Sequence, residues 1–124
     1  MRIFKNRWFV RFARKEKIGD AALCDAIRRA EMGLIDADLG GGLIKQRVAR
    51  PGEGRSGGYR SIIVYRAGSS AFFVFGFAKS GRENLNAAET AGFKDLAAML
   101  LPLDGTKLAE QVAFGELTEV FCNG

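Results

Sequence analysis

The middle of the chain alternates apolar and polar residues with a period of two, which is the pattern of β-strands. Three runs of this kind are Leu43–Arg50, Gly58–Arg66 and Ala71–Lys79, and their isoleucine, valine, tyrosine and phenylalanine residues favour strands. Pro51–Gly57 contains a proline and three glycines, and Ala67–Ser70 contains a glycine and two serines, which is typical of hairpin connections. The sequence therefore predicts a three-stranded antiparallel meander.

Side chains along a strand point alternately to its two faces, so the pattern also predicts which residues share a face. On the first strand, Lys45 and Arg47 are expected on the same face. On the second strand, Arg60 and Arg66 share a face with two apolar residues, which suits a central strand. The third strand is expected to direct one dense apolar stripe into the core, formed by Phe73, Phe75 and Phe77.

Two helices are predicted before the meander. Asn6 is a good N-cap, and apolar residues recur after it at helical spacing until Gly19. Asp20 is then placed to cap a second helix, which Gly33 ends. The two helices are expected to form an antiparallel hairpin, and Met1–Lys5 in front of them is expected to add an edge strand.

The remaining segments complete the predicted fold. Leu34–Gly42 is interpreted as a turn-rich connection. Asn86 and Glu89 have the spacing of a capping box that starts a long helix, Asp104 is placed to cap a shorter one, and Glu116–Phe121 is expected to be a brief strand or a loose tail. The 124 residues, 48% of them hydrophobic, fit one domain. We predict an α+β fold with an antiparallel meander sheet of about four strands, an N-terminal helical hairpin and C-terminal helices.

Charge is distributed unevenly along the chain. Residues 43–82 carry eight basic residues and one acid, a net charge of +7 in a chain whose total is +5, whereas residues 83–124 carry −5. A solvated sheet face normally mixes both signs, and like charges facing each other destabilise a sheet. The excess therefore favours an anion-binding site. Its basic residues are Lys45, Arg47, Arg50, Arg55, Arg60, Arg66, Lys79 and Arg82.

A second group of cations lies at the N-terminus. Residues 1–17 carry seven basic residues and one acid, and Arg7, Arg11, Arg14 and Lys15 recur on the polar side of the first predicted helix. This stripe is either simply solvated or a second contact surface for nucleic acid, and the sequence leaves both interpretations open. The basic balance of the chain points to nucleic acid or an acidic protein as partner.

Composition excludes some kinds of chemistry. The chain has no histidine, which excludes a histidine base and a histidine-liganded metal, and two distant cysteines provide no zinc cluster. Cys24 and Cys122 are predicted to be free thiols in a reducing cytoplasm. No apolar run is long enough for a membrane span or a signal peptide, so no membrane association is expected. The glycines at 40–42 precede a strand, which disfavours a nucleotide-binding loop.

The order of strand, two helices, three-stranded meander and helix resembles the RelE/ParE superfamily of bacterial toxin–antitoxin toxins. The segments similar to its RelE/HigB-like branch are Leu43–Arg47, Ser56–Arg60, Tyr65 and Phe75–Lys79. The resemblance spans Met1–Leu100 and leaves 101–124 as a C-terminal extension of the single domain. It implies a cytoplasmic toxin that cuts messenger RNA in the ribosomal A site and is silenced by a cognate antitoxin. Some relatives poison DNA gyrase instead.

By position, the resemblance implies a catalytic site of five cations around the scissile phosphate. These are Lys45, Arg47, Arg60, Lys79 and Arg82. The other basic residues expected to bind RNA are Arg50, Arg55, Arg66, Arg7, Arg11 and Arg14. Several relatives place a tyrosine or histidine just after the last strand, and Ser80–Leu85 contains neither. No cofactor and no metal ion are expected.

Cleavage by the neighbouring 2′-hydroxyl needs a proton acceptor, neutralisation of the phosphorane and a proton for the leaving oxygen. Like charges at Arg47 and Arg60 favour the neutral amine of Lys45, which can accept a proton, whereas arginine stays charged. Tyr59, Tyr65, the RNA or the ribosome are the alternative acceptors. The competing hypothesis is a non-enzymatic basic module that binds nucleic acid or a protein.

Overall fold

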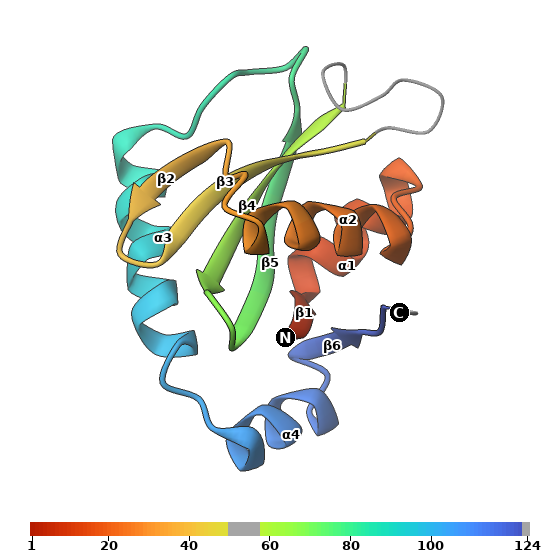
Figure 1. Cartoon of the computed structure of the whole chain (residues 1–124), viewed down its shortest axis with the longest axis vertical. Coiled ribbons are helices and arrows are strands. Elements are labelled where there is room, and N and C mark those ends of the chain that lie inside the picture. Colours follow the sequence, from red (N-terminus) through yellow and green to blue (C-terminus); the bar gives the residue numbers. More distant parts are fainter. Residues whose placement is uncertain (50–57, 123–124) are drawn as a thin grey trace.

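The computed structural model describes residues 1–49 and 58–122, and within them it shows the predicted α+β fold (Figure 1). The elements are β1 (Arg2–Asn6), α1 (Arg7–Glu16), α2 (Asp20–Glu31), β2 (Ala37–Gly40), β3 (Leu43–Val48), β4 (Tyr59–Arg66), β5 (Ser70–Ala78), α3 (Ala87–Leu100), α4 (Gly105–Ala113) and β6 (Leu117–Val120). None of the helices in the described ranges is long and apolar enough to cross a membrane.

The strands form one sheet in the order β2-β3-β4-β5-β1-β6. The predicted meander is confirmed, because β3 pairs antiparallel with β4 and β4 pairs antiparallel with β5. The predicted connection Pro51–Gly57 between β3 and β4 lies outside the described residues. β1 runs parallel to β5, and the helical hairpin of α1 and α2 that follows β1 leads across the sheet to β2 at its edge.

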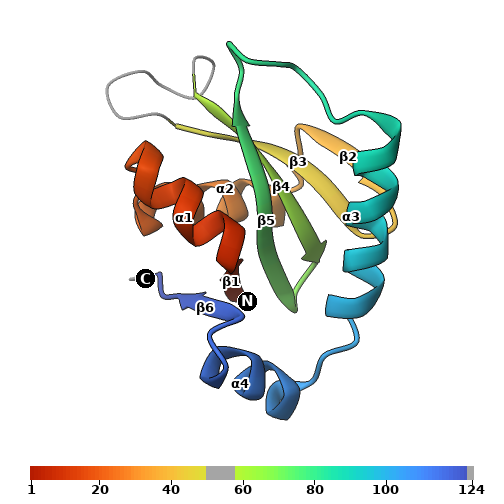
Figure 2. The same ribbon diagram turned by 180° about the vertical axis from the view of Figure 1, so that it is seen from behind.

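Both faces of the sheet are covered, so the protein has two hydrophobic clusters. α1 and α2 lie on one face and α3 on the other (Figures 1 and 2). On the hairpin face, Phe9 of α1 and Ile27 of α2 pack with Ile63 of β4. On the α3 face, Ala97 of α3 packs with Ile62 of β4. Neighbouring residues of β4 therefore enter different clusters, as the alternation of a strand buried on both faces requires.

A β-bulge corrects the expectation that three phenylalanines form one stripe. The register between β4 and β5 shifts between Ile62 and Ile63, which pair with Phe75 and Phe73. An extra residue in one strand reverses the face of everything beyond it. Phe73 is consequently buried on the hairpin face, while Phe75 and Phe77 lie on the α3 face. Sequence spacing alone could not show this, because nothing in the run marks the bulge.

The sheet has six strands in the described residues rather than about four. Ala37–Gly40, expected to be turns, pairs with β3 as the edge strand β2. The strand expected at Met1–Lys5 is confirmed as β1, but its expected edge position is wrong, because β1 lies between β5 and β6. The end of the chain returns as β6 and pairs antiparallel with β1, Asn6 opposite Leu117 and Ile3 opposite Val120.

The predicted helix starts are largely confirmed. The Asn6 side chain accepts a hydrogen bond from the Phe9 amide at 2.8 Å. Asn86 and Glu89 form the expected reciprocal capping box of α3, and Asp104 caps α4. Gly19, rather than Asp20, is the N-cap of α2. These caps satisfy backbone amides that have no partner inside the helix, and so fix where each helix begins.

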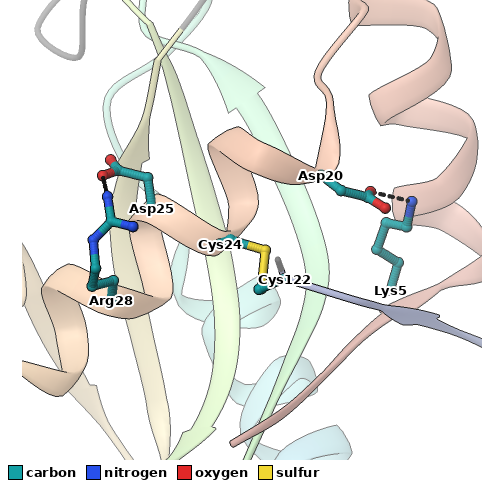
Figure 3. Close-up of a disulfide and its surroundings, with 6 residues drawn as sticks. All are labelled: Lys5, Asp20, Cys24, Asp25, Arg28 and Cys122. Atoms are coloured by element: carbon teal, nitrogen blue, oxygen red, sulfur yellow. Dashed lines mark hydrogen bonds and ion pairs between the residues drawn. A yellow bond between two sulfur atoms is a disulfide. The ribbon is translucent and has the colours of Figure 1, made fainter. Parts of the chain in front are cut away.

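The prediction of two free cysteines is wrong. Cys24 on α2 and Cys122 just after β6 form a disulfide, with their Cα atoms 5.9 Å apart (Figure 3). Lys5 of β1 forms an ion pair with Asp20 of α2 at 3.2 Å beside it. The two cysteines are separated by 98 positions, and only the return of the chain through α4 and β6 brings them together. Sequence distance therefore concealed the pairing.

We expect reduction of this disulfide to lower the free energy of unfolding by up to about 4 to 5 kcal/mol, because it closes a very long loop in the unfolded chain. Urea unfolding with and without reductant, followed by far-ultraviolet circular dichroism, measures the difference. The double variant Cys24→Ser/Cys122→Ser should unfold like the reduced parent and should not respond to reductant. Equal midpoints for oxidised and reduced parent would contradict the expectation.

Candidate active site

The register of β3 and β4 brings three of the predicted catalytic cations onto one face of the sheet. Arg47 pairs directly with Arg60, and Lys45 pairs with Ile62. Ile62 is buried in the cluster beneath α3, so the three cations project from the α3 face. Opposed side chains of an antiparallel pair have Cβ atoms about 5 Å apart. Arg47 and Arg60 therefore place two positive charges side by side.

Arg82 joins these residues from the segment after β5. Its guanidinium carbon lies 5.1 Å from the ring centre of Phe75 and 5.0 Å from that of Phe77. Both rings face α3, and a guanidinium above aromatic rings is held by cation–π attraction. Its Nη1 also donates to Glu89 of α3 at 2.7 Å. In the following, the cationic face means Lys45, Arg47, Arg60 and Arg82.

Lys45 is tied to the segment that leads into α3. Its Nζ donates to the side-chain oxygen of Asn84 and lies 3.4 Å from the carbonyl oxygen of Glu83. Lys45 is half-buried. An ammonium has three donors, so these two contacts orient Nζ and leave one N–H for another acceptor.

Arg47 is held by Asp36, the residue just before β2. The Asp36 carboxylate accepts from the Arg47 amide at 2.6 Å and from its guanidinium at 3.2 Å. Arg29 of α2, largely buried, lies 3.8 Å from the same carboxylate and donates to the Arg47 carbonyl. Burial by itself raises the pKa of Asp36, but the hydrogen bonds from Arg47 outweigh it and hold the pKa below the ordinary aspartate value.

Glu89 holds the guanidinium of Arg82 as Asp36 holds that of Arg47. The hydrogen bond from Arg82 and the bond from the Asn86 amide lower the pKa of the Glu89 carboxyl below its ordinary value. The capping box of α3 therefore does two things at once: it starts the helix, and it fixes the guanidinium of Arg82 above the sheet.

Arg60 differs from the other three cations. Its Nη1 is buried and donates no hydrogen bond, and no carboxylate in residues 1–49 or 58–122 pairs with Arg60. A buried donor without a partner costs about 1 to 3 kcal/mol. Its neighbours add to this cost, because Arg60 faces Arg47 on β3 and Phe77 on β5. A phosphate bound at this face would offset the like charges of Arg47 and Arg60.

The other predicted site residues lie away from the cationic face or outside the described residues. Lys79 is exposed directly after β5. Arg66 is exposed at the far end of β4, six residues and about 20 Å from Arg60. Arg50 and Arg55 lie outside the described residues. The remaining three, on α1, belong to the other side of the sheet and are Arg7, Arg11 and Arg14.

Neither tyrosine shares the cationic face. Tyr59 is buried on the hairpin face, where its hydroxyl donates to Glu16 of α1 at 2.9 Å. Tyr65 lies six residues further along β4, on the same face as Tyr59. The chain has only these two tyrosines. The alternation of β4 thus directs both phenols away from Arg60, and neither is positioned to exchange protons with a ligand bound there.

Three residues of the site were missed from the sequence. Glu89 was expected only as a helix cap, Asp36 only as a turn residue of the connection Leu34–Gly42, and Asn84 was not singled out at all. Glu89 could have been found, because a capping box after a basic segment places a carboxylate near it. Asp36 and Asn84 leave no such signal, since each meets its partner across the sheet edge or across the loop before α3.

With this geometry in place, the chain can be compared with known proteins. The family described as "RelE toxin of RelE / RelB toxin-antitoxin system" matches residues 1–120. The chain therefore belongs to the RelE toxin family. It is a toxin of a toxin–antitoxin system, and the family implies a cognate antitoxin as partner. No individual curated protein matches the chain.

We expect acid to weaken the protein through Asp36. Its folded-state pKa is below the unfolded value of about 3.8, so the unfolded chain binds the proton first and the carboxylate stabilises the fold above that pH. This contribution is lost as the pH falls through the folded pKa. Carboxyl carbon shifts in NMR titrations should give an Asp36 midpoint below 3.8. Arg47→Gln keeps the hydrogen bond from the backbone amide but removes the guanidinium, so it should move the Asp36 midpoint part of the way back toward the unfolded value. A midpoint at or above 3.8 in the parent would contradict the expectation.

Arg60→Met should raise the free energy of unfolding by at least about 1 kcal/mol, because it removes the buried donor and the repulsion with Arg47. Arg66→Met, on the same strand but exposed, should change it by less than about 0.5 kcal/mol. Urea unfolding of both variants gives the comparison. A less stable Arg60→Met protein would mean that Arg60 supports the fold rather than a ligand.

Proposed function

We propose that this toxin is a metal-independent endoribonuclease that cleaves messenger RNA on the ribosome, and that its antitoxin neutralises it by covering the cationic face. The observation that supports this best is the pair formed by Arg47 and Arg60, with Nη1 of Arg60 buried and unsatisfied. Uncompensated positive charge in a strand pair reduces stability. The positive charge of this strand pair is explained if the site binds a phosphate.

The reaction follows from the chemistry of RNA. The 2′-oxygen attacks the adjacent phosphorus, the bond from phosphorus to the 5′-oxygen breaks, and the products end in a 2′,3′-cyclic phosphate and a 5′-hydroxyl. Arg60, which has no carboxylate partner among the described residues, is assigned to the phosphorane oxygens. Arg82, which Glu89 holds on the β5 side of Arg60, supplies a second fixed positive charge. Lys79, exposed after β5, is assigned to an adjacent phosphate.

Lys45 is assigned to the proton transfer. Asn84 and Glu83 orient its Nζ from one side, and this nitrogen is the proposed acceptor for the proton of the 2′-hydroxyl. Both tyrosines lie on the hairpin face, which leaves lysine, the RNA or the ribosome as the source of acid and base. If Lys45 serves only as a phosphate contact, the proton acceptor belongs to the RNA or the ribosome.

A second candidate function is inhibition by binding alone, of nucleic acid or of a protein such as DNA gyrase. Two observations favour it. Ser80–Leu85 contains no tyrosine or histidine, and Lys45, Arg47 and Arg82 each already have a partner in the protein. Such partners suit cations that position a ligand without exchanging protons with it.

The partners follow from the charge of the cationic face. An antitoxin that covers it is expected to bring acidic side chains, which steer association and neutralise the face. Action on translating ribosomes places the protein in the cytoplasm, where disulfides are generally reduced. In that compartment the stability supplied by the Cys24–Cys122 bond is available only under oxidising conditions.

Inducible expression followed by mapping of messenger RNA 5′ ends tests the proposal. New 5′ ends should appear with the parent and vanish when the adjacent antitoxin gene is co-expressed. Lys45→Ala and Lys45→Arg should both lose cleavage at least about 100-fold, the usual contribution of an acid or base. Lys45→Arg should keep most RNA affinity, because it keeps the charge. Lys107→Gln, exposed on α4, is the control.

In a purified ribosome assay, cleavage should persist in excess EDTA once ribosome integrity is controlled, and the products should carry a 2′,3′-cyclic phosphate. Growth arrest without new 5′ ends would favour the binding-only alternative. Lys45→Arg cleaving at the parental rate would remove Lys45 from the proton transfer.

A further inference from the structure

A shallow surface pocket of about 210 Å³ lies on α1, outside the cationic face. Its walls are Trp8, Arg11, Phe12 and Lys15. The rings of Trp8 and Phe12 stack with their centres 5.1 Å apart and an angle of 19° between their planes. Two parallel aromatic rings thus stand beside two cations on a single helix.

The neighbouring strand holds this pair of rings in place. At Gly76 of β5, a Cβ atom would lie only 2.6 Å from Cε2 of Phe12, so the absence of a side chain lets Phe12 pack directly on the strand. Phe12 also meets Tyr59 edge-on at 5.6 Å. Trp8 contacts Phe75 with their ring centres 4.5 Å apart. The rings are therefore fixed by packing and half-exposed, as a stacking surface requires.

The two cations of the pocket have no carboxylate partner among the described residues. Arg11 follows Trp8 by three positions and Lys15 follows Phe12 by three, so each cation flanks a ring on the same side of α1. The nearby acids are already engaged: Glu116 pairs with Arg7 at 3.4 Å, and Glu16 accepts from Tyr59. Arg11 and Lys15 are exposed and available to anions.

The pocket is connected to the cationic face. Phe75 contacts Trp8 on one side and lies under the guanidinium of Arg82 on the other. The pairing of β1 with β5 ends at Lys5 and Phe73, and beyond it only the side-chain amide of Asn6 reaches β5, at Val74. The second half of β5 is therefore not paired with β1, and α1 packs on it instead, through Trp8 on Phe75 and Phe12 on Gly76.

We propose that this pocket binds one unpaired base of the RNA, stacked on Trp8 and Phe12, with the flanking phosphates on Arg11 and Lys15. Base stacking on aromatic rings with cations along the backbone is the general way in which proteins hold single strands without reading their sequence. The proposal rests on the proposed function, since it takes RNA as the ligand, and it gives that RNA a second contact beyond the scissile phosphate. An apolar side chain of the antitoxin is the competing occupant, but it would make no use of Arg11 and Lys15.

Trp8 is the chain's single tryptophan, so its fluorescence reports directly on the pocket. The probe is a short single-stranded oligoribonucleotide with a 2′-O-methyl group on every ribose, which blocks attack by the 2′-oxygen and keeps the ligand intact. Titration into the full-length protein should quench Trp8 emission to a saturable end point. Inorganic polyphosphate, which has charge but no bases, should not quench it.

The matched variants separate this pocket from general charge. The double variant Arg11→Gln/Lys15→Gln should weaken the quenching isotherm and lower the slope of log affinity against log salt by about 1.4, since each phosphate contact of a single strand contributes about 0.7. The control Arg28→Gln/Lys107→Gln, which removes two exposed cations from α2 and α4, should keep the parental salt slope. Circular dichroism of both variants confirms that they are folded.

Three results would overturn the proposal: no change in Trp8 emission with RNA, equal quenching by polyphosphate, or the same loss of salt slope in both double variants. Quenching by the antitoxin but not by RNA would assign the pocket to the antitoxin instead. The 5′-end mapping is independent of this experiment. Cleavage without quenching would refute only the pocket, whereas quenching without cleavage would support the pocket and refute the endoribonuclease.

Discussion

The opposition of Arg47 and Arg60 across β3 and β4 is the constraint on which the rest of the site depends. Their register fixes two positive charges next to each other on a sheet whose two faces are both covered. Such a pair is unfavourable by itself, so the surrounding structure has to hold it in place. The two hydrophobic clusters provide that support, because neither strand can slip by one residue without exchanging its buried and exposed side chains.

The residues around the pair reduce its cost in different ways. Asp36 neutralises Arg47, Asn84 orients Lys45, and Glu89 holds Arg82 above two aromatic rings. Each of these partners belongs to a different segment: the residue just before β2, the loop after β5 and the first turn of α3. Among these four cations, Arg60 keeps a buried donor unsatisfied. The arrangement is the one expected of the proposed phosphate site, in which the fold fixes the charges before the ligand arrives.

The C-terminal part of the chain stabilises this arrangement from the opposite end of the sheet. α4 and β6 lead back to β1, β6 covers what would otherwise be an exposed strand edge, and the disulfide joins its end to α2. An uncovered edge invites pairing with other chains. Because β6 pairs with β1, the edge strands of the sheet are β2 and the short β6. The disulfide thereby ties the helical hairpin to the end of β6, in addition to the packing of the hairpin on the sheet. The aromatic pocket on α1 is held in place with it.

The sequence by itself determined the local and periodic features. Alternation along β3 and β4 predicted that Lys45 and Arg47 share a face, the caps at Asn6, Asn86 and Asp104 marked helix starts, and the charge of the meander pointed to an anion. These are properties of neighbouring residues, which the chain encodes directly. The tertiary structure decided what depends on distant segments. The bulge in β5, the sixth strand beside β1, the disulfide over 98 positions and the partners of each cation all arise where segments meet in space. A periodic pattern carries no information about such meetings, because many registers and packings satisfy the same alternation and only the packing energy of the complete fold selects one.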